Sequence, residues 1–237
     1  MAVVVSIAIL FIIIFCLKAA LNQIKLNKKD LELIKTVTSL ERGTDSELRL
    51  ILKLLKAGIP PGTIFHDLII KKKDDKFSQV DIVLATTQGI IVIEVKEYSG
   101  WIFGSGNQTN WTQVLAYGKN KYRFYNLVKQ VKSQVLSIKN SLKQFEKIPF
   151  FSIIVFFGDC QLKEINYVPE KTFIVRPHRV LEAINSIKAN NLAAPYENKH
   201  EVVNALKEAV LNGANEHYQK KHINNIKNIV GKHRILD

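Results

Sequence analysis

The chain has 237 residues, with 34 Lys and Arg against 21 Asp and Glu, which gives a formal net charge of +13. Hydrophobic residues make up 47% and charged residues 23%, which excludes a disordered or low-complexity chain. The length accommodates one ordinary domain with appendages. The excess of positive charge is compatible with an acidic partner, either nucleic acid or a membrane surface.

The first apolar segment covers residues 2–17 and is interrupted only by Ser6. Extended to Leu21 it would form a helix of about 30 Å, the hydrocarbon thickness of a bilayer. Lys18 lies near one end, where its charge can reach the headgroups. The alternative, a cleaved signal peptide, is disfavoured because no Lys or Arg precedes the segment and no A-x-A cleavage site follows it. The sequence therefore predicts a transmembrane anchor over residues 1–21.

Basic residues follow this segment at Lys18, Lys25, Lys28 and Lys29, and none precedes it. The positive-inside rule then predicts a single-pass protein of the cell membrane with its N-terminus outside and its soluble part in the cytoplasm. Residues 22–43 are expected to form a basic juxtamembrane linker or helix that ends at Gly43.

A helix is expected to begin after Gly43, since Thr44 or Asp45 can cap it and Glu47 completes a capping box with Thr44. The Gly and Pro residues at 58–62 end this helix. Strands are predicted at residues 64–70, 80–85 and 90–95, followed by a loop rich in Gly, Asn and Thr. We place a catalytic-type domain at residues 44–157 and a strand and helical extension at 158–237.

Helical periodicity returns from Val128 to Phe145, with apolar residues spaced three and four apart. Two buried strands are expected at residues 152–157 and 172–175, and helical patterns at 179–188, 201–211 and 216–230. The order of helix, three strands, helix and strand predicts an α/β fold in which helices pack on a mixed sheet.

Four polar residues interrupt two otherwise apolar strands. If the strands at 80–85 and 90–95 pair through a two-residue turn at Thr87 and Gln88, Asp81 falls opposite Glu94. Gln79 then falls opposite Lys96, and all four side chains share one face of the hairpin.

Two carboxylates this close repel each other unless a proton or a cation lies between them, and oxygen ligands suit Mg²⁺ or Mn²⁺. We therefore interpret Asp81 and Glu94 as ligands of a hard divalent metal. Lys96 would orient a water or a phosphate, a set of groups suited to phosphodiester hydrolysis. The alternative is that both carboxylates are ordinary strand-end residues and Lys96 forms a salt bridge with one of them.

Several ordered motifs resemble the NERD domain, the nuclease-related domain of the PD-(D/E)xK nuclease superfamily, over residues 44–157. They are Asp45-Ser46-Glu47, His66-Asp67-Leu68, Ser78-Gln79-Val80-Asp81, residues 89–96, Tyr98-Ser99-Gly100, Ile102-Phe103-Gly104 and Trp111. This resemblance implies an αβββαβ core. It also implies a metal-dependent site in which Glu47 joins Asp81, Glu94 and Lys96, with Gln79 beside them.

Two positions depart from the family pattern. Val80 stands where the superfamily name has Pro, and it precedes the metal ligand on the other face of the strand. The family's Asn-Pro-x-x-Gln element is present as Asn126-Leu127-Val128-Lys129-Gln130, so the Pro is missing and Gln130 is retained.

An acid-free region extends from Tyr98 to Phe145 and carries many basic residues next to the aromatic residues Trp111, Tyr117, Tyr122, Phe124 and Tyr125. Such a composition suits phosphate neutralisation and base stacking. The alternatives are a solvated basic face or attraction to anionic lipid. We expect nucleic acid, with DNA favoured over RNA, to be bound by Lys119, Lys121, Arg123, Lys129, Gln130 and Lys132.

The sequence thus favours a membrane-anchored, Mg²⁺- or Mn²⁺-dependent nuclease. A non-catalytic module that keeps a nuclease fold and tethers nucleic acid or a partner at the membrane is the second hypothesis, and a lipid-reading structural protein is the third. The sequence does not define an oligomeric state.

Overall fold

The computed structural model describes residues 28–72, 76–115 and 118–215. The predicted anchor at residues 1–21, the first part of the linker and the helix expected at 216–230 lie outside these residues. Within the described ranges no helix has the length and apolar character needed to cross a membrane.

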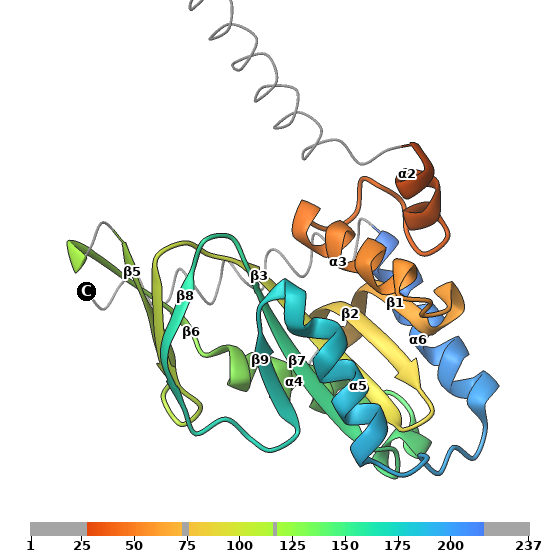
Figure 1. Cartoon of the computed structure of the whole chain (residues 1–237). Coiled ribbons are helices and arrows are strands. Elements are labelled where there is room, and N and C mark those ends of the chain that lie inside the picture. Colours follow the sequence, from red (N-terminus) through yellow and green to blue (C-terminus); the bar gives the residue numbers. More distant parts are fainter. Residues whose placement is uncertain (1–27, 73–75, 116–117, 216–237) are drawn as a thin grey trace, which may run out of the picture.

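The described residues form two sheets with helices packed against them (Figure 1). The helices are α2 (Lys28–Lys35), α3 (Asp45–Lys56), α4 (Leu127–Lys139), α5 (Val180–Asn190) and α6 (Lys199–Ala214). The strands are β1 (Ile64–Lys71), β2 (Phe77–Thr86), β3 (Gly89–Glu97), β4 (Trp101–Ser105), β5 (Asn110–Leu115), β6 (Asn120–Tyr125), β7 (Phe150–Phe157), β8 (Gln161–Asn166) and β9 (Thr172–Val175).

The central sheet has the strand order β1-β2-β3-β7-β9. Its first three strands are antiparallel, whereas β7 pairs parallel to both β3 and β9. Read along the chain, α3, β1, β2, β3, α4 and β7 give the expected αβββαβ order, so the mixed α/β architecture fits a nuclease-like core. The expected hairpin register is confirmed from Ile82 paired with Ile93 to Thr86 paired with Gly89.

The prediction of a loop between β3 and α4 is wrong. This segment contains β4, β5 and β6, which pair with β8 in a second sheet of order β6-β5-β4-β8, here called the small sheet. Residue types common in turns, such as Gly104 within β4 and Gly106 and Asn107 after it, concealed these short strands. Strand β8, the partner of β4, lies more than 50 residues further along the chain, and Gly104 is required because an added Cβ would lie 2.3 Å from Cδ2 of Trp111.

Three apolar clusters hold the layers together. One joins α3 and α5 to one face of the central sheet, through side chains such as Leu54, Ile93 and Ile184. A second joins α6 and the end of α4 to the opposite face, and a third fills the space between the start of α4, β7 and the small sheet around Trp111. Figure 1 shows the small sheet projecting from one end of this layered body.

Two helix ends differ from the expected positions. The linker helix α2 ends at Lys35, and turns occupy the chain up to Thr44, which caps α3 as predicted by accepting a hydrogen bond from the Glu47 amide. The helix expected to reach Phe145 ends at Lys139 and is followed by a 3-10 turn at Lys143–Glu146, which inserts Phe145 into the core.

Elements beyond residue 157 are integral to the body of the fold. Strand β9 completes the edge of the central sheet, and α6 packs along β1, as Figure 1 shows. This packing is close enough that an added Cβ at Gly213 would lie 1.9 Å from the carbonyl oxygen of Asp67. The segment labelled as an extension from the sequence therefore supports the strand that lies beside the candidate site.

Candidate active site

The polar end of the hairpin formed by β2 and β3 carries the first candidate residue. The backbone ladder between these strands ends at Ile82 and Ile93. Beyond it, the half-buried Asp81 accepts a hydrogen bond from the Val95 amide at 2.8 Å through its Oδ2 atom. The carboxylate thus takes the place of a ladder bond and is fixed beside β3.

Glu94 is fully buried, and side chains from α4 hold its carboxylate. Gln130 Nε2 donates to Oε1 and Gln134 Nε2 donates to Oε2, each at 2.6 Å. Lys96, on the same face of β3, forms an ion pair with Oε1 and keeps 30% of its side chain exposed. A charged group without water needs such compensation, and here it comes from two amides and an ammonium.

The electrostatics of this cluster favour an additional positive charge. Loss of hydration, followed by the negative charges of Glu94 and Glu47, raises the pKa of Asp81 well above its usual value, although Lys96 and the Val95 amide oppose the shift. Burial lowers the pKa of Lys96, but the charges of Glu94 and Asp81 outweigh it, so this pKa is raised. The carboxylates are therefore only partly compensated by Lys96.

Glu47 lies at the start of α3 and is turned toward a different partner. Its Oε2 atom pairs with His66 Nε2 at 2.9 Å, and its Oε1 atom accepts from the Thr44 hydroxyl at 2.8 Å. Burial opposes ionisation, but the hydrogen bonds from His66 and Thr44 outweigh it and lower the pKa of Glu47. The close approach requires Gly43, where an added Cβ would lie 2.5 Å from Glu47 Oε2.

The backbone ladder with β3 ends before Gln79 and Lys96, so the predicted pairing of these two residues is not part of it. The side-chain amide of Gln79 donates to Asp67 Oδ1 at 3.0 Å. Asp67 adopts a positive φ of 54° and also binds Arg42, whose Nε donates to Oδ2 at 3.0 Å. Gln79 contributes to the site through its backbone carbonyl, which accepts from Gln134 at 3.0 Å.

Sequence reasoning missed two residues that the fold brings to the site. Gln134 follows Gln130 by one helical turn, so the i, i+4 spacing could have indicated that both amides face the same carboxylate. His66 is fully buried and bonds Thr38 Oγ1 through Nδ1 at 2.9 Å, which fixes the ring against Glu47. The motif His66-Asp67-Leu68 marked this position as part of the resemblance, but no residue near His66 in the sequence indicated that its ring would bond Glu47.

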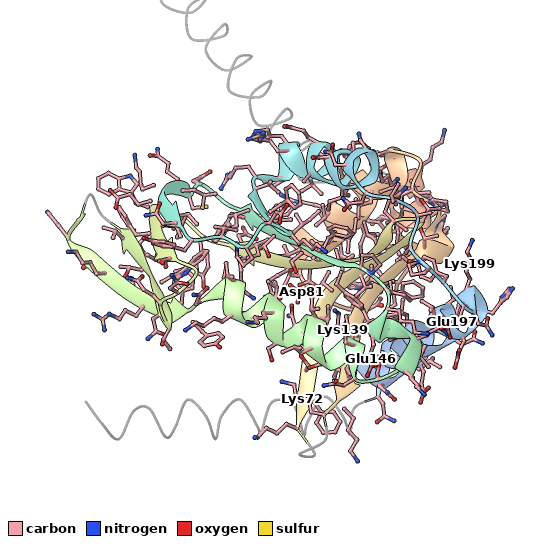
Figure 2. The ribbon with its side chains drawn as sticks, turned by 90° about the horizontal axis from the view of Figure 1, so that it is seen from below. Lys72, Asp81, Lys139, Glu146, Glu197 and Lys199 are labelled. Atoms are coloured by element: carbon pink, nitrogen blue, oxygen red, sulfur yellow. The ribbon has the colours of Figure 1, made fainter. Side chains whose placement is uncertain are left out.

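The proposed nucleic-acid contacts divide into two groups. Lys119 precedes β6, Lys121 and Arg123 are exposed on β6, and Lys129 and Lys132 lie on α4. Gln130 lies inside the site against Glu94 rather than on the surface of the helix. Figure 2, seen from the α4 side, shows Asp81 beside this helix.

The aromatic residues of the acid-free region do not form one stacking surface. Trp111 is fully buried and donates its indole N–H to the Ser105 carbonyl at 3.0 Å. Phe124 packs with it, at 6.2 Å between ring centroids. Tyr122 and Tyr125 are exposed by 52% and 51%. Alternation along β6 places Tyr125 on the face opposite Phe124, whereas Tyr122 shares the face of Phe124 and is nevertheless exposed.

No group of three or more His, Cys, Asp or Glu side chains is arranged to hold a metal ion in the part of the chain that the structure describes. The carboxylates of Asp81 and Glu94 lie close enough for the charge of Glu94 to raise the pKa of Asp81, while the carboxylate of Glu47 is directed to His66. The site thus holds two neighbouring carboxylates and an ammonium.

Residues 41–157 match the family model described as NERD, the nuclease-related domain. The match includes Glu47, His66, Asp81, Glu94, Lys96, Gln130 and Gln134 and supports the presence of this domain in nearly half of the chain. Over 123 residues the chain is 25% identical to an uncharacterized protein of Bacillus anthracis. That alignment covers 52% of this chain and 56% of the relative, so the chain spans little more than half of the relative's length. No solved structure matches the chain significantly.

Proposed function

We propose that this protein is a metal-dependent nuclease that hydrolyses phosphodiester bonds in nucleic acid. The observation that carries the proposal is the convergence of Asp81, Glu94 and Lys96 at the open end of the β2–β3 hairpin. Structural strands seldom place two carboxylates and a lysine in such surroundings, because charge loses hydration there. The match of residues 41–157 to a nuclease-related domain agrees with this reaction class.

The donor set suits Mg²⁺ or Mn²⁺, which prefer carboxylate oxygens. Asp81 and Glu94 would hold the ion, and Glu47 would join them if its carboxylate left His66. Gln134 Oε1 is a buried acceptor without a partner among the described residues, an oxygen that an ion-bound water could engage. When bound, the metal supplies Lewis acidity and a more acidic water.

Each remaining group has a role that follows from its contacts. Gln130 and Gln134 orient the Glu94 carboxylate by holding one oxygen each. Lys96 positions the attacking water or stabilises charge on the phosphate, because its ammonium lies beside Glu94 and remains partly exposed. Lys129 and Lys132 on α4, with Lys121 and Arg123 on β6, supply positive charge for the polyanion, for which we favour DNA.

A non-catalytic nucleic-acid-binding module is the second candidate. It is favoured by the contacts of Glu94, whose two oxygens are both engaged by protein groups, and by the pairing of Glu47 with His66. In that case the carboxylates of Glu94 and Glu47 would serve to stabilise the fold, and neither would be available to bind a metal.

Cleavage by the full-length protein in non-ionic detergent tests the proposal. We expect labelled DNA to be cleaved with Mg²⁺ or Mn²⁺, to remain intact with EDTA, and to be cleaved again after the metal is restored, because the water must be activated by the ion. Single-stranded DNA, duplex DNA and RNA should be compared in parallel. A pure, folded protein that binds these substrates and cleaves none of them with either metal would support the non-catalytic module instead.

We also propose that residues 1–21 anchor the protein in the cell membrane, with the N-terminus outside and the folded part in the cytoplasm. The support is the apolar segment and the basic residues that follow it. In a Cys16→Ser, Cys160→Ser background, Ala2→Cys should react with a membrane-impermeant maleimide on intact cells. Lys207→Cys, exposed on α6, should react only after lysis. The reverse pattern, or recovery in the soluble fraction, would contradict this topology.

A further inference from the structure

The small sheet has two faces, and only one of them is used by the core. Ile102, Trp111 and Phe124 point into the apolar cluster beneath the sheet. Side chains alternate along a strand, so Trp101, Phe103 and Tyr125 belong to the opposite face. Trp101 and Phe103 are members of none of the four apolar clusters in the described part of the chain. This second face is called the outer face.

The strand register arranges the outer face in rows. Trp101 on β4 is paired with Val114 on β5, which is paired with Lys121 on β6. The next row runs in the same way from Phe103 through Thr112 to Arg123. Each row therefore begins with an aromatic ring and ends with an exposed cation, with about 10 Å between the outer strands.

Two further side chains continue this pattern at the two ends of the face. Tyr125, paired with Asn110, follows Arg123 on the same side of β6 and is 51% exposed. On the opposite edge, Lys163 of β8 places its ammonium 5.4 Å from the centroid of the Trp101 ring. The face thus carries three cations, Lys121, Arg123 and Lys163. Glu164, which is paired with Phe103, adds one negative charge.

The outer face interleaves the half-buried rings of Trp101 and Phe103 and the exposed ring of Tyr125 with Lys and Arg, an arrangement suited to unpaired nucleic acid. Bases of a single strand can stack on the rings while phosphates contact the cations, whereas a duplex keeps its bases inside and offers only phosphates. A base that stacks on Trp101 would displace the Lys163 ammonium, and the adjoining phosphate gives that ammonium a new partner.

The outer face is joined to the candidate active site by two short connections. Trp101 follows Lys96 of the site by five positions along the chain, and Gln130 follows Tyr125 by five. Five residues span at most about 18 Å. One strand of nucleic acid can therefore contact the outer face and the site together.

We propose that the outer face binds a single strand of nucleic acid, with bases against aromatic rings and phosphates against cations, and thereby selects unpaired substrate for the site. The residues are Trp101, Phe103, Tyr125, Lys121, Arg123 and Lys163. This inference rests on the proposed function in so far as a nuclease site needs nucleic acid beside it, but binding is measurable without cleavage.

The test measures fluorescence anisotropy of a labelled oligothymidylate of about 16 nucleotides and of a duplex of equal length, with the full-length protein in non-ionic detergent and EDTA. The single strand should bind more tightly than the duplex. Trp101→Leu and Tyr125→Leu should each weaken single-strand binding about tenfold through lost stacking. Arg123→Gln should lower the salt slope by about 0.7, the value for one phosphate contact of a single strand.

Tyr122→Leu is the matched control, because Tyr122 lies on the same strand with 52% exposure but on the opposite face. Its single-strand affinity should stay near that of the unmodified protein. Since Trp101→Leu alters a half-buried residue, its melting temperature is measured as well, and the exposed Tyr125 provides a substitution with less structural risk.

Equal affinity for duplex and single strand would overturn the proposal. Single-strand affinities of Trp101→Leu and Tyr125→Leu equal to that of Tyr122→Leu would also overturn it. So would a protein that binds anionic lipid vesicles through these residues but does not bind oligothymidylate. A protein that binds single strands through the outer face and cleaves none would retain this inference and refute the nuclease. A protein that cleaves nucleic acid while the outer-face variants bind single strands normally would support the nuclease and refute this inference.

Discussion

Asp81→Asn should abolish metal-dependent cleavage, with a loss of about a thousandfold or more, and should at the same time raise the melting temperature. Asn keeps the oxygen that accepts the Val95 amide but removes the charge that lies close to Glu94 and Glu47. Removing this charge should relieve about 1 kcal/mol of electrostatic repulsion and desolvation cost. For a domain of this size, that corresponds to a rise in melting temperature of about 2–4 °C. Initial cleavage rates and thermal unfolding without metal measure the two effects.

Asp159→Asn provides the matched control, because Asp159 is exposed in the turn between β7 and β8. It should change neither the rate nor the melting temperature. The combination of a lost activity and a gained stability is the mark of a residue kept for function at the expense of the fold. An inactive Asp81→Asn that melts at a lower temperature than the parent would instead indicate a structural carboxylate.

Lys96→Met should destabilise the fold by about 2–3 kcal/mol, because it leaves the buried Glu94 without its cation. This value lies at or below the lower end of the range for a broken buried pair, about 3–5 kcal/mol, since the Lys96 side chain is 30% exposed and water screens part of the interaction. The pKa of Lys96 is raised in the fold, so its contribution is fully present at neutral pH and is lost only as the pH rises through that raised pKa. Denaturant unfolding measures the effect.

The double variant Glu94→Gln, Lys96→Met should recover most of this stability, because both charges are then absent. Both variants should be inactive in the cleavage assay. Lys188→Met, on the exposed side of α5, is the control and should unfold like the parent protein. If the double variant is no more stable than Lys96→Met, the two side chains do not form the energetic pair that the proposed site requires.

The two carboxylates of the cluster are compensated to different degrees. Asp81 carries repulsion that the fold does not relieve, while Glu94 is retained only because Lys96, Gln130 and Gln134 compensate it. A bound divalent cation would lower the cost of both carboxylates. The same cluster thus supplies the reason for proposing a metal and the means of testing it without a bound ion.

Local patterns determined much of this fold. The apolar strands with a two-residue turn at Thr87 and Gln88 defined the register of the β2–β3 hairpin, which the structure confirms up to Ile82 and Ile93. The capping residues Thr44 and Glu47 located the start of α3. These features depend on neighbours in the chain, because side-chain alternation and helix capping are set within a few residues.

Tertiary structure decided the rest. The amide of Gln134 reaches Glu94 across 40 residues, and Glu47 is turned to His66 rather than to Asp81. The small sheet is completed by β8 from beyond residue 157, which pairs with β4, and packing of one face of this sheet buries Trp111 while Tyr125 on the other face stays exposed. Sequence alone therefore determined which residues carry charge and where the hairpin turns. Packing between distant segments determined which side chains meet, because such contacts leave no periodic signal in the chain.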